Sequence, residues 1–301
     1  MKKLLLLVGL LIAAPYFSDA SLRVFACEPE WASLAEEIGG DKVSTFSATH
    51  AQQNPHYIRA RPSLIAKIRR ADLLICSGAG LEVGWLPILL QKADAALQPG
   101  RRGYINASDH VTVLELPTVV DRSLGDIHPE GNPHVHLNPV NILKVANVIY
   151  ERLCQLDAEN APYYQDRLEQ FQQRWTIASA QWKKRSESLK GTSVVVYHKN
   201  FTYLLDWLEM KKVGSLEPKP GLPPTASHLN QLLKEAETTE LSLIIHTPYE
   251  NDKAAQWLSS RTGTTVVELP YTIGGNEQSN DLFGLYDQTI SLLIEAVSNE
   301  R

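Results

Sequence analysis

The chain has 301 residues, of which 44% are hydrophobic, and a formal net charge of −5 at pH 7. This length and composition provide enough apolar surface for one large domain or two medium domains, each with its own core. No basic tract stands out in the sequence, so nucleic acid has no electrostatic basis as a partner. Composition and charge therefore favour a globular protein that binds something other than DNA or RNA.

The first twenty residues have the pattern of a secretory signal peptide. Lys2 and Lys3 precede an apolar run over 4–14, and small residues lead to a cleavage site after Ala20. The run is too short to span a bilayer, which takes about 20 residues. We therefore expect export and a mature chain from Ser21 with a net charge of −6, since the leader holds two lysines and one aspartate.

Three cysteines allow at most one disulfide in an exported protein: Cys27, Cys76 and Cys154. Cys27 and Cys76 each end a short apolar run, which is compatible with neighbouring strands, and the sequence leaves open whether they are bonded. No cysteine stands at the cleavage site. We therefore expect a monomer without a membrane anchor, in the periplasm of a Gram-negative cell.

Short apolar runs alternate with longer amphipathic segments in the first half of the chain. Strands are predicted over 22–27, 43–49, 73–77 and 103–107, and helices over 31–38, 62–71 and 81–97. The second half repeats the pattern, with strands over 193–198, 211–217, 241–247 and 264–269, and helices over 200–209, 226–237, 251–261 and 281–300. Such alternation is typical of βαβ units that build a mostly parallel sheet.

The middle of the chain has almost no strand signal and predicts two helices. One covers 139–155, and the second covers 161–189, which at 1.5 Å per residue extends about 43 Å. That length suffices to cross from one lobe to another. The predicted fold class is therefore α/β, with two lobes, each a mostly parallel four-stranded sheet flanked by helices, joined by a long rigid connecting helix.

Four of the nine histidines fall where a ligand would bind such a fold. His198 and His246 end two predicted strands, His56 lies in the loop NPHY after another, and His134 lies in the loop GNPHVHLNP. Ligands of open α/β sheets bind beyond the carboxyl ends of the strands. Neutral imidazoles suit the four-coordinate Zn²⁺ ion and favour it over Mn²⁺. These four residues are the predicted metal ligands.

Four motifs, in this order and spacing, resemble those of the solute-binding proteins of zinc and manganese ABC transporters: NPHYIRARPS, ADLLICSGAGLE, GNPHVHLNPVN and VVYHKNFTYLLDWL. The resemblance covers essentially the whole mature sequence. It implies one metal ion between two lobes, held by His56, His134 and His198, and no enzymatic activity. It also implies delivery of the ion to a membrane permease that an ATPase drives, with Zn²⁺ as the transported ligand and Mn²⁺ as the weaker candidate.

The domain organisation follows from the resemblance and from the order of elements. We expect a signal peptide over 1–20, an N-terminal metal-binding lobe over 21–138, a helical connector over 139–190 and a C-terminal metal-binding lobe over 191–301.

The fourth ligand is where the sequence departs from the family. The family often supplies an aspartate just after the last strand, where this chain has Pro270. His246 is the favoured replacement, while Glu250 and a water molecule remain open. His136 either supports a ligand from behind or is an exposed neighbour of the site, and the second interpretation is favoured.

A short polar insertion precedes the second ligand and contains Asp126, His128 and Glu130. Such a loop could collect ions weakly at the mouth of the cleft, but a solvated polar turn is the favoured interpretation. Glu28 and Glu30, after the first strand, are expected to line the cleft without binding the ion.

Other functions remain compatible with the same residues. An exported zinc-dependent hydrolase also uses three histidines and an open position, although the chain has no HExxH motif. A transport protein for manganese, iron or a metal chelate is the other alternative.

Overall fold

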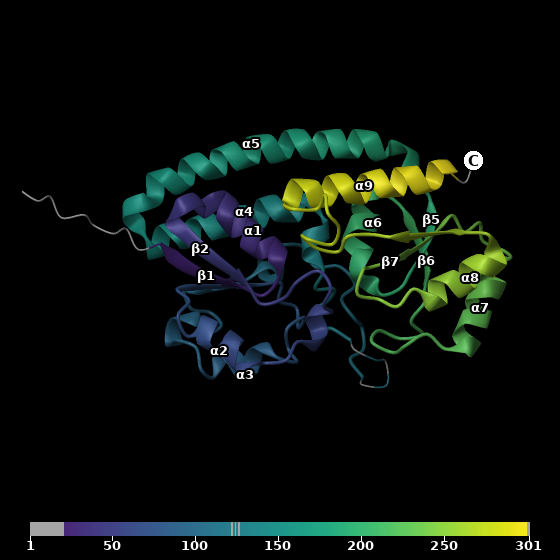
Figure 1. The fold of residues 1–301 in the computed structure, drawn as a ribbon, viewed down its shortest axis with the longest axis horizontal. Helices are drawn as coiled ribbons and strands as arrows, with labels where there is room; N and C mark the ends of the chain where they lie inside the picture. The colour runs from purple at the N-terminus through teal and green to yellow at the C-terminus, as the bar shows by residue number, and fades with distance from the viewer. Residues whose placement is uncertain (1–20, 122, 124, 126, 300–301) are drawn as a thin grey trace, which may run out of the picture.

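The computed structural model describes residues 21–121, 123, 125 and 127–299 (Figure 1). The predicted signal peptide at 1–20 lies outside the described residues. Over the described ranges, no helix combines the length and the apolar character needed to cross a bilayer.

The first sheet has four parallel strands in the order β2-β1-β3-β4. They are β1 (Leu22–Ala26), β2 (Val43–Ser47), β3 (Leu73–Cys76) and β4 (Tyr104–Asn106). The central strands are β1 and β3. All of β3 and the last three residues of β1 are buried, as expected of a parallel sheet covered on both faces. All four strands predicted for this half are confirmed.

The second sheet repeats this arrangement in the order β6-β5-β7-β8, again with parallel pairing. Its strands are β5 (Ser193–Val196), β6 (Lys211–Ser215), β7 (Leu243–His246) and β8 (Thr265–Glu268). In both sheets the strand order reverses beside the first strand, which creates a crevice at the carboxyl edge.

Three α-helices belong to the first sheet: α1 (Pro29–Gly39), α2 (Pro62–Ile68) and α3 (Leu86–Leu90). The helix predicted over 81–97 is wrong, because only α3 forms within that range. Gly84 packs so closely that a Cβ there would lie 3.1 Å from the His56 carbonyl oxygen. Pro87 then sits in the first turn of α3, where its missing N–H is tolerated. Asp94 caps a separate 3₁₀ turn over 95–97.

The second sheet is covered by α6 (Thr202–Leu208), α7 (Ala226–Ala236), α8 (Lys253–Thr262) and α9 (Leu282–Asn299). The Thr225 hydroxyl accepts the His228 N–H and so caps α7. Gly263 ends α8 with a φ of +75°, which glycine adopts without strain.

The connector consists of α4 (Pro139–Leu156) and α5 (Ala161–Arg185). Figure 1 shows α5 running along one side of both lobes. At its start, Arg167 Nε donates to the Glu37 carbonyl of α1 at 2.9 Å, and at its end Arg185 pairs with Asp287 of α9. The helix predicted to reach residue 189 ends at Arg185 and continues as a 3₁₀ turn.

Aromatic packing fixes the connector against the rest of the protein. Trp175 stacks on Phe171 at 5.3 Å between ring centroids and packs against Tyr286 of α9 at 5.3 Å. Its indole N–H also donates to the Pro139 carbonyl at 2.9 Å. Buried side chains from both sheets, α4, α5 and α9 form one continuous core, so we expect the lobes to move little against each other.

A disulfide joins Cys27, just after β1, to Cys76, the last residue of β3. The neighbouring strands β1 and β3 bring the two Cα atoms to 4.8 Å, a distance that a disulfide spans. The pairing that the sequence left open is therefore present, and Cys154 is the free cysteine.

Candidate metal centre

Three histidines from different segments meet at the facing edges of the two sheets. His56 lies in a 3₁₀ turn after β2, His134 directly precedes a 3₁₀ turn before α4, and His198 follows β5. One ring nitrogen from each lies within 4.8 Å of the others. Ring centroids are 5.4 Å apart for His56 and His134, 5.4 Å for His56 and His198, and 5.7 Å for His134 and His198. The structure thus brings together three of the four predicted ligands.

The His56 ring is oriented by its own turn. Asn54 Oδ1 accepts the His56 backbone N–H at 3.0 Å and lies 2.8 Å from His56 Nδ1. An amide oxygen only accepts hydrogen bonds, so Nδ1 carries the proton and Nε2 carries the lone pair.

The His134 ring is held from the C-terminal half of the chain. Its Nδ1 lies 2.7 Å from the Tyr271 hydroxyl oxygen, while its Nε2 is buried and has no hydrogen-bond partner among the described residues. An unpartnered buried nitrogen costs about 1–3 kcal/mol. A metal ion bound at Nε2 would remove this cost.

The His198 ring is oriented by a carboxylate. Its Nδ1 lies 2.6 Å from Glu217 Oε2, which also accepts the Gly221 backbone N–H at 3.0 Å. A carboxylate behind the distal nitrogen fixes the tautomer of a metal-binding imidazole and raises its basicity. All three rings therefore have Nδ1 engaged by an outer partner, which makes Nε2 the nitrogen that would bind an ion.

Burial keeps two of these imidazoles neutral. Desolvation lowers the pKa of His56 and His134 well below the usual value of 6.5, and the neighbouring histidines lower both further. A metal binds the neutral ring only, so at neutral pH these two residues need not release a proton before they bind.

His246 ends β7 as predicted but is not one of the three clustered histidines. Its Nδ1 lies 3.0 Å from the Thr247 carbonyl oxygen and 4.0 Å from Glu268 Oε2. The alternative Glu250 has both oxygens engaged, by Asn200 Nδ2 at 2.9 Å and by the Thr247 N–H at 2.7 Å. His246 as the fourth ligand stays a prediction.

The interpretation of His136 as an exposed neighbour is wrong. The 3₁₀ turn Val135–Leu137 directs its ring inward, and the residue is 0% exposed. Its Nε2 donates to the Tyr271 carbonyl at 2.9 Å, and its Nδ1 lies 3.1 Å from Glu30 Oε1. His136 therefore supports the Tyr271 segment, whose hydroxyl holds His134.

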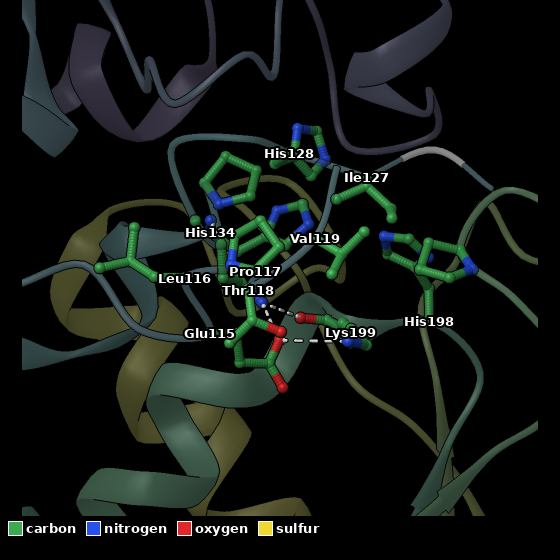
Figure 2. A pocket seen from close by; sticks show the side chains of 14 residues that line it. Glu115, Leu116, Pro117, Thr118, Val119, Ile127, His128, His134, His198 and Lys199 are labelled. Carbon is green, nitrogen blue, oxygen red and sulfur yellow. Dashed lines mark hydrogen bonds and ion pairs between the residues drawn. The ribbon is translucent and has the colours of Figure 1, made fainter. Parts of the chain in front are cut away.

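The insertion before His134 was interpreted as a solvated turn, and this is wrong for His128. Its Nε2 lies 3.1 Å from His56 Nε2, whereas Glu130 is exposed and Asp126 lies outside the described residues. Figure 2 shows His128, His134 and His198 around one cavity, with Leu116 and Val119 beside them. The cavity has a volume of about 640 Å³.

Glu28 and Glu30 lie deeper than the cleft lining expected from the sequence, at 1% and 0% exposure. Glu28 and Glu82 share the Ser77 backbone N–H, at 3.3 Å and 2.8 Å. Burial raises the pKa of Glu82 to about 7. Burial, and then the negative charge of Glu82, raise the pKa of Glu28 well above its usual value.

Sequence reasoning missed the residues that orient the rings. Asn54 precedes the Pro-His pair in NPHY, where an Asx cap is a recognisable signal, and Glu217 follows a predicted strand at the same sheet edge as His198. Tyr271 had no such signal, because its contact with His134 joins residues 137 positions apart.

A family model described as the periplasmic zinc-uptake complex component A, ZnuA, matches residues 24–296. The metal ABC transporter substrate-binding lipoprotein SsaB of Streptococcus sanguinis is 27% identical over 261 residues, which are 85% of this chain and 82% of that protein. The manganese ABC transporter substrate-binding lipoprotein scaA of Streptococcus gordonii is 26% identical over 172 residues, which are 57% of this chain and 54% of that protein.

A crystal structure of ZnuA superposes with a TM-score of 0.74 at 20% identity, and the match covers 91% of this chain and 99% of that one. At this identity the likeness establishes the fold. It confirms the predicted architecture of two four-stranded parallel sheets joined by a long helix.

Proposed function

We propose that this chain, which belongs to the family of periplasmic zinc-uptake component A proteins, captures Zn²⁺ with His56, His134 and His198 and delivers it to a membrane permease. Family membership itself makes the chain a substrate-binding protein of a metal ABC transporter, which works with a permease and an ATPase. It also makes the chain a binding protein and not an enzyme, so the hydrolase alternative is set aside.

One observation carries the assignment of the ligands. Three imidazoles from the two lobes converge: His56, His134 and His198. The Nδ1 atom of each ring contacts a different partner, namely Asn54, Tyr271 and Glu217. For His56 and His198 this arrangement presets the tautomer in which Nε2 binds a metal. For His134, the Tyr271 hydroxyl engages Nδ1 and Nε2 has no hydrogen-bond partner among the described residues. A merely structural histidine cluster would not need one ring nitrogen of each residue to lie within 4.8 Å of the others.

The donor set supports zinc as the cargo. The clustered ligands in the described part of the chain are all imidazoles, and imidazole suits Zn²⁺, whereas Mn²⁺ prefers carboxylate and water oxygens. Manganese is the second candidate, since relatives such as scaA are named for it.

We further propose that the protein works in the periplasm as a monomer after loss of residues 1–20. The lobes would cover 21–138 and 191–301, with the connector at 139–190 between them. The first residue of the purified exported protein, read by N-terminal sequencing after cell fractionation, tests the leader. A first residue of Met1 in the cytoplasmic fraction would contradict it.

Metal content and competition titration test the cargo. Protein purified without added ions should retain one zinc per chain, and apo protein should bind zinc more tightly than manganese. His134→Ala should weaken zinc binding by at least about 100-fold, taking the loss for an outer partner, about 10–100-fold, as a lower bound.

His228→Ala is the matched control, because His228 Nε2 contacts the Ser215 carbonyl at 2.8 Å and lies outside the clustered set. Equal zinc affinities in the two variants would reject the ligand assignment. Tighter binding of manganese would keep the site and change the cargo.

A further inference from the structure

We propose that His128 is the fourth metal ligand and completes a shell of four imidazoles. This inference rests on the proposed function and deepens it. The three clustered histidines leave one position of a tetrahedral zinc site unfilled, and His128 is the histidine whose ring nitrogen touches one of them.

The distances support a ligand role. His128 Nε2 lies 3.1 Å from His56 Nε2, and the ring centroids are 5.1 Å apart. Two nitrogens that each bind a tetrahedral zinc at about 2.0–2.1 Å lie about 3.3 Å apart. The His128 and His134 centroids are 6.5 Å apart, so His128 would move slightly toward the centre when the ion binds.

The hydrogen-bond pattern around His56 and His128 is compatible with metal binding by His128. His56 Nδ1 donates to Asn54 Oδ1, so His56 Nε2 has a lone pair and accepts from the Nε2–H of His128. When an ion enters, the His128 proton moves to Nδ1 and its Nε2 lone pair becomes a ligand. The ring stays neutral throughout, and binding releases no proton from this residue.

The backbone holds His128 in place from both sides. The His128 carbonyl accepts the Gly131 N–H at 3.0 Å in a turn that requires the φ of +97° at Gly131. On the other side, Gly125 approaches the second lobe so closely that a Cβ would lie 2.4 Å from the Pro220 carbonyl oxygen. His128 therefore stands on a segment whose position depends on both lobes.

The second lobe also anchors the ends of this segment. The Tyr203 hydroxyl accepts the Leu114 N–H at 3.0 Å and donates to the Asn132 carbonyl at 2.8 Å. Glu115 has a left-handed φ of +53° and pairs with Lys212 at 2.6 Å. An energetically unfavourable backbone conformation persists only where surrounding contacts enforce it, and here contacts from the second lobe hold the chain on both sides of the segment that contains His128.

Four imidazoles have a consequence for specificity. A shell without a carboxylate disfavours Mn²⁺ and favours Zn²⁺ and other ions that accept nitrogen ligands well. His128 would thus replace the oxygen ligand that the sequence lacks near Pro270.

X-ray absorption at the zinc edge, on the full-length mature protein loaded with one zinc, tests this role. The native protein should show four imidazole nitrogens, and His128→Ala should show three with a water oxygen. Zinc affinity should fall at least about tenfold in His128→Ala, by analogy with the loss of supporting ligands, and manganese affinity should fall less. His110→Ala, on an exposed turn, is the control and should change neither measurement.

The outcomes separate this inference from the proposed function. Three imidazoles and an oxygen in both the native protein and His128→Ala would overturn the role of His128 alone. Loss of an imidazole in His246→Ala, with none lost in His128→Ala, would assign the position to His246. Zinc without any histidine in its shell would overturn the proposed function itself.

Discussion

The two lobes share one strand order and contribute unequally to the proposed metal centre. The first sheet and its following loops supply His56 and His134, whereas the second supplies His198. The first lobe also has a disulfide between its central strands, while the second has no cysteine. The shared topology fixes the edge at which a ligand binds, and the loops after the strands decide which chemistry each lobe brings there.

The outer partners of the rings differ in the same way. The first lobe orients His56 with an amide, Asn54, whereas the second orients His198 with a carboxylate, Glu217. A carboxylate adds negative charge behind the ring and strengthens the ligand more than an amide does.

Trp175→Ala should have the largest effect, because it affects both lobes at once. Trp175 is 0% exposed and packs between α5, α4 and α9. Its loss should lower the free energy of unfolding by about 3–5 kcal/mol, measured by urea denaturation. Ile177→Ala on the exposed face of the same helix should stay within about 0.5 kcal/mol. Equal effects would mean that α5 is not braced by this core.

Removing the disulfide should destabilise the first lobe alone. The bond closes a loop with a sequence separation of 49, and Cys27→Ala with Cys76→Ala should cost about 2–4 kcal/mol. Hydrogen exchange should quicken in β1 and β3 and remain unchanged in β5 and β7. Cys154→Ala is the control. Uniformly faster exchange in both sheets would show that the lobes unfold as one unit.

Glu217→Gln and Asn54→Ala compare the outer partners directly. Each should weaken zinc binding by about 10–100-fold, with the larger loss for Glu217→Gln because it removes a charge. Calorimetric titration of the apo proteins measures both. If Asn54→Ala has the larger effect, ring orientation matters more than ligand basicity.

The last comparison, Glu82→Gln, concerns the pH dependence of stability. The folded-state pKa of Glu82 is raised to about 7 from an ordinary 4.5 by burial. The contribution of Glu82 to the free energy of unfolding is therefore fully present below about pH 4.5 and is lost as the pH rises through 7. The free energy of unfolding falls by at most about 1.4 kcal/mol per pH unit over this range.

Thermal unfolding between pH 5 and 8 should therefore show a flatter profile for Glu82→Gln than for the native protein. Exposed Glu130→Gln should leave the native profile unchanged. Parallel profiles for Glu82→Gln and the native protein would contradict a raised pKa.

The sequence was sufficient for the sheets because most of their strands are short apolar runs that alternate with amphipathic segments. Runs such as SVVV at β5 and LLIC at β3 have few other interpretations. It failed over 81–97, where apolar spacing suggested a helix. There, Gly84 lies close to the His56 carbonyl, a tertiary contact that apolar spacing does not reveal.

The residues of the candidate site could be predicted where they lie in loops at the carboxyl ends of strands. His56, His134 and His198 were found from their positions after strands and in loops, and they cluster. His136 and His128 were misjudged because burial of a loop residue depends on what packs over it: Tyr271 in one case, His56 in the other. Neither contact leaves a periodic pattern in the sequence.

The anchoring of the segment over 111–134 to Tyr203 and Lys212 limits how the gene can be divided. A polypeptide that stopped before α4 would contain three of the four histidines proposed to bind the ion, His56, His128 and His134. It would lack Tyr203 and Lys212, which anchor the segment that contains His128 and His134. Split-protein reporters and isolated-half expression should therefore fail at this junction. Insertions are better placed at exposed positions of the outer helices, such as the end of α7.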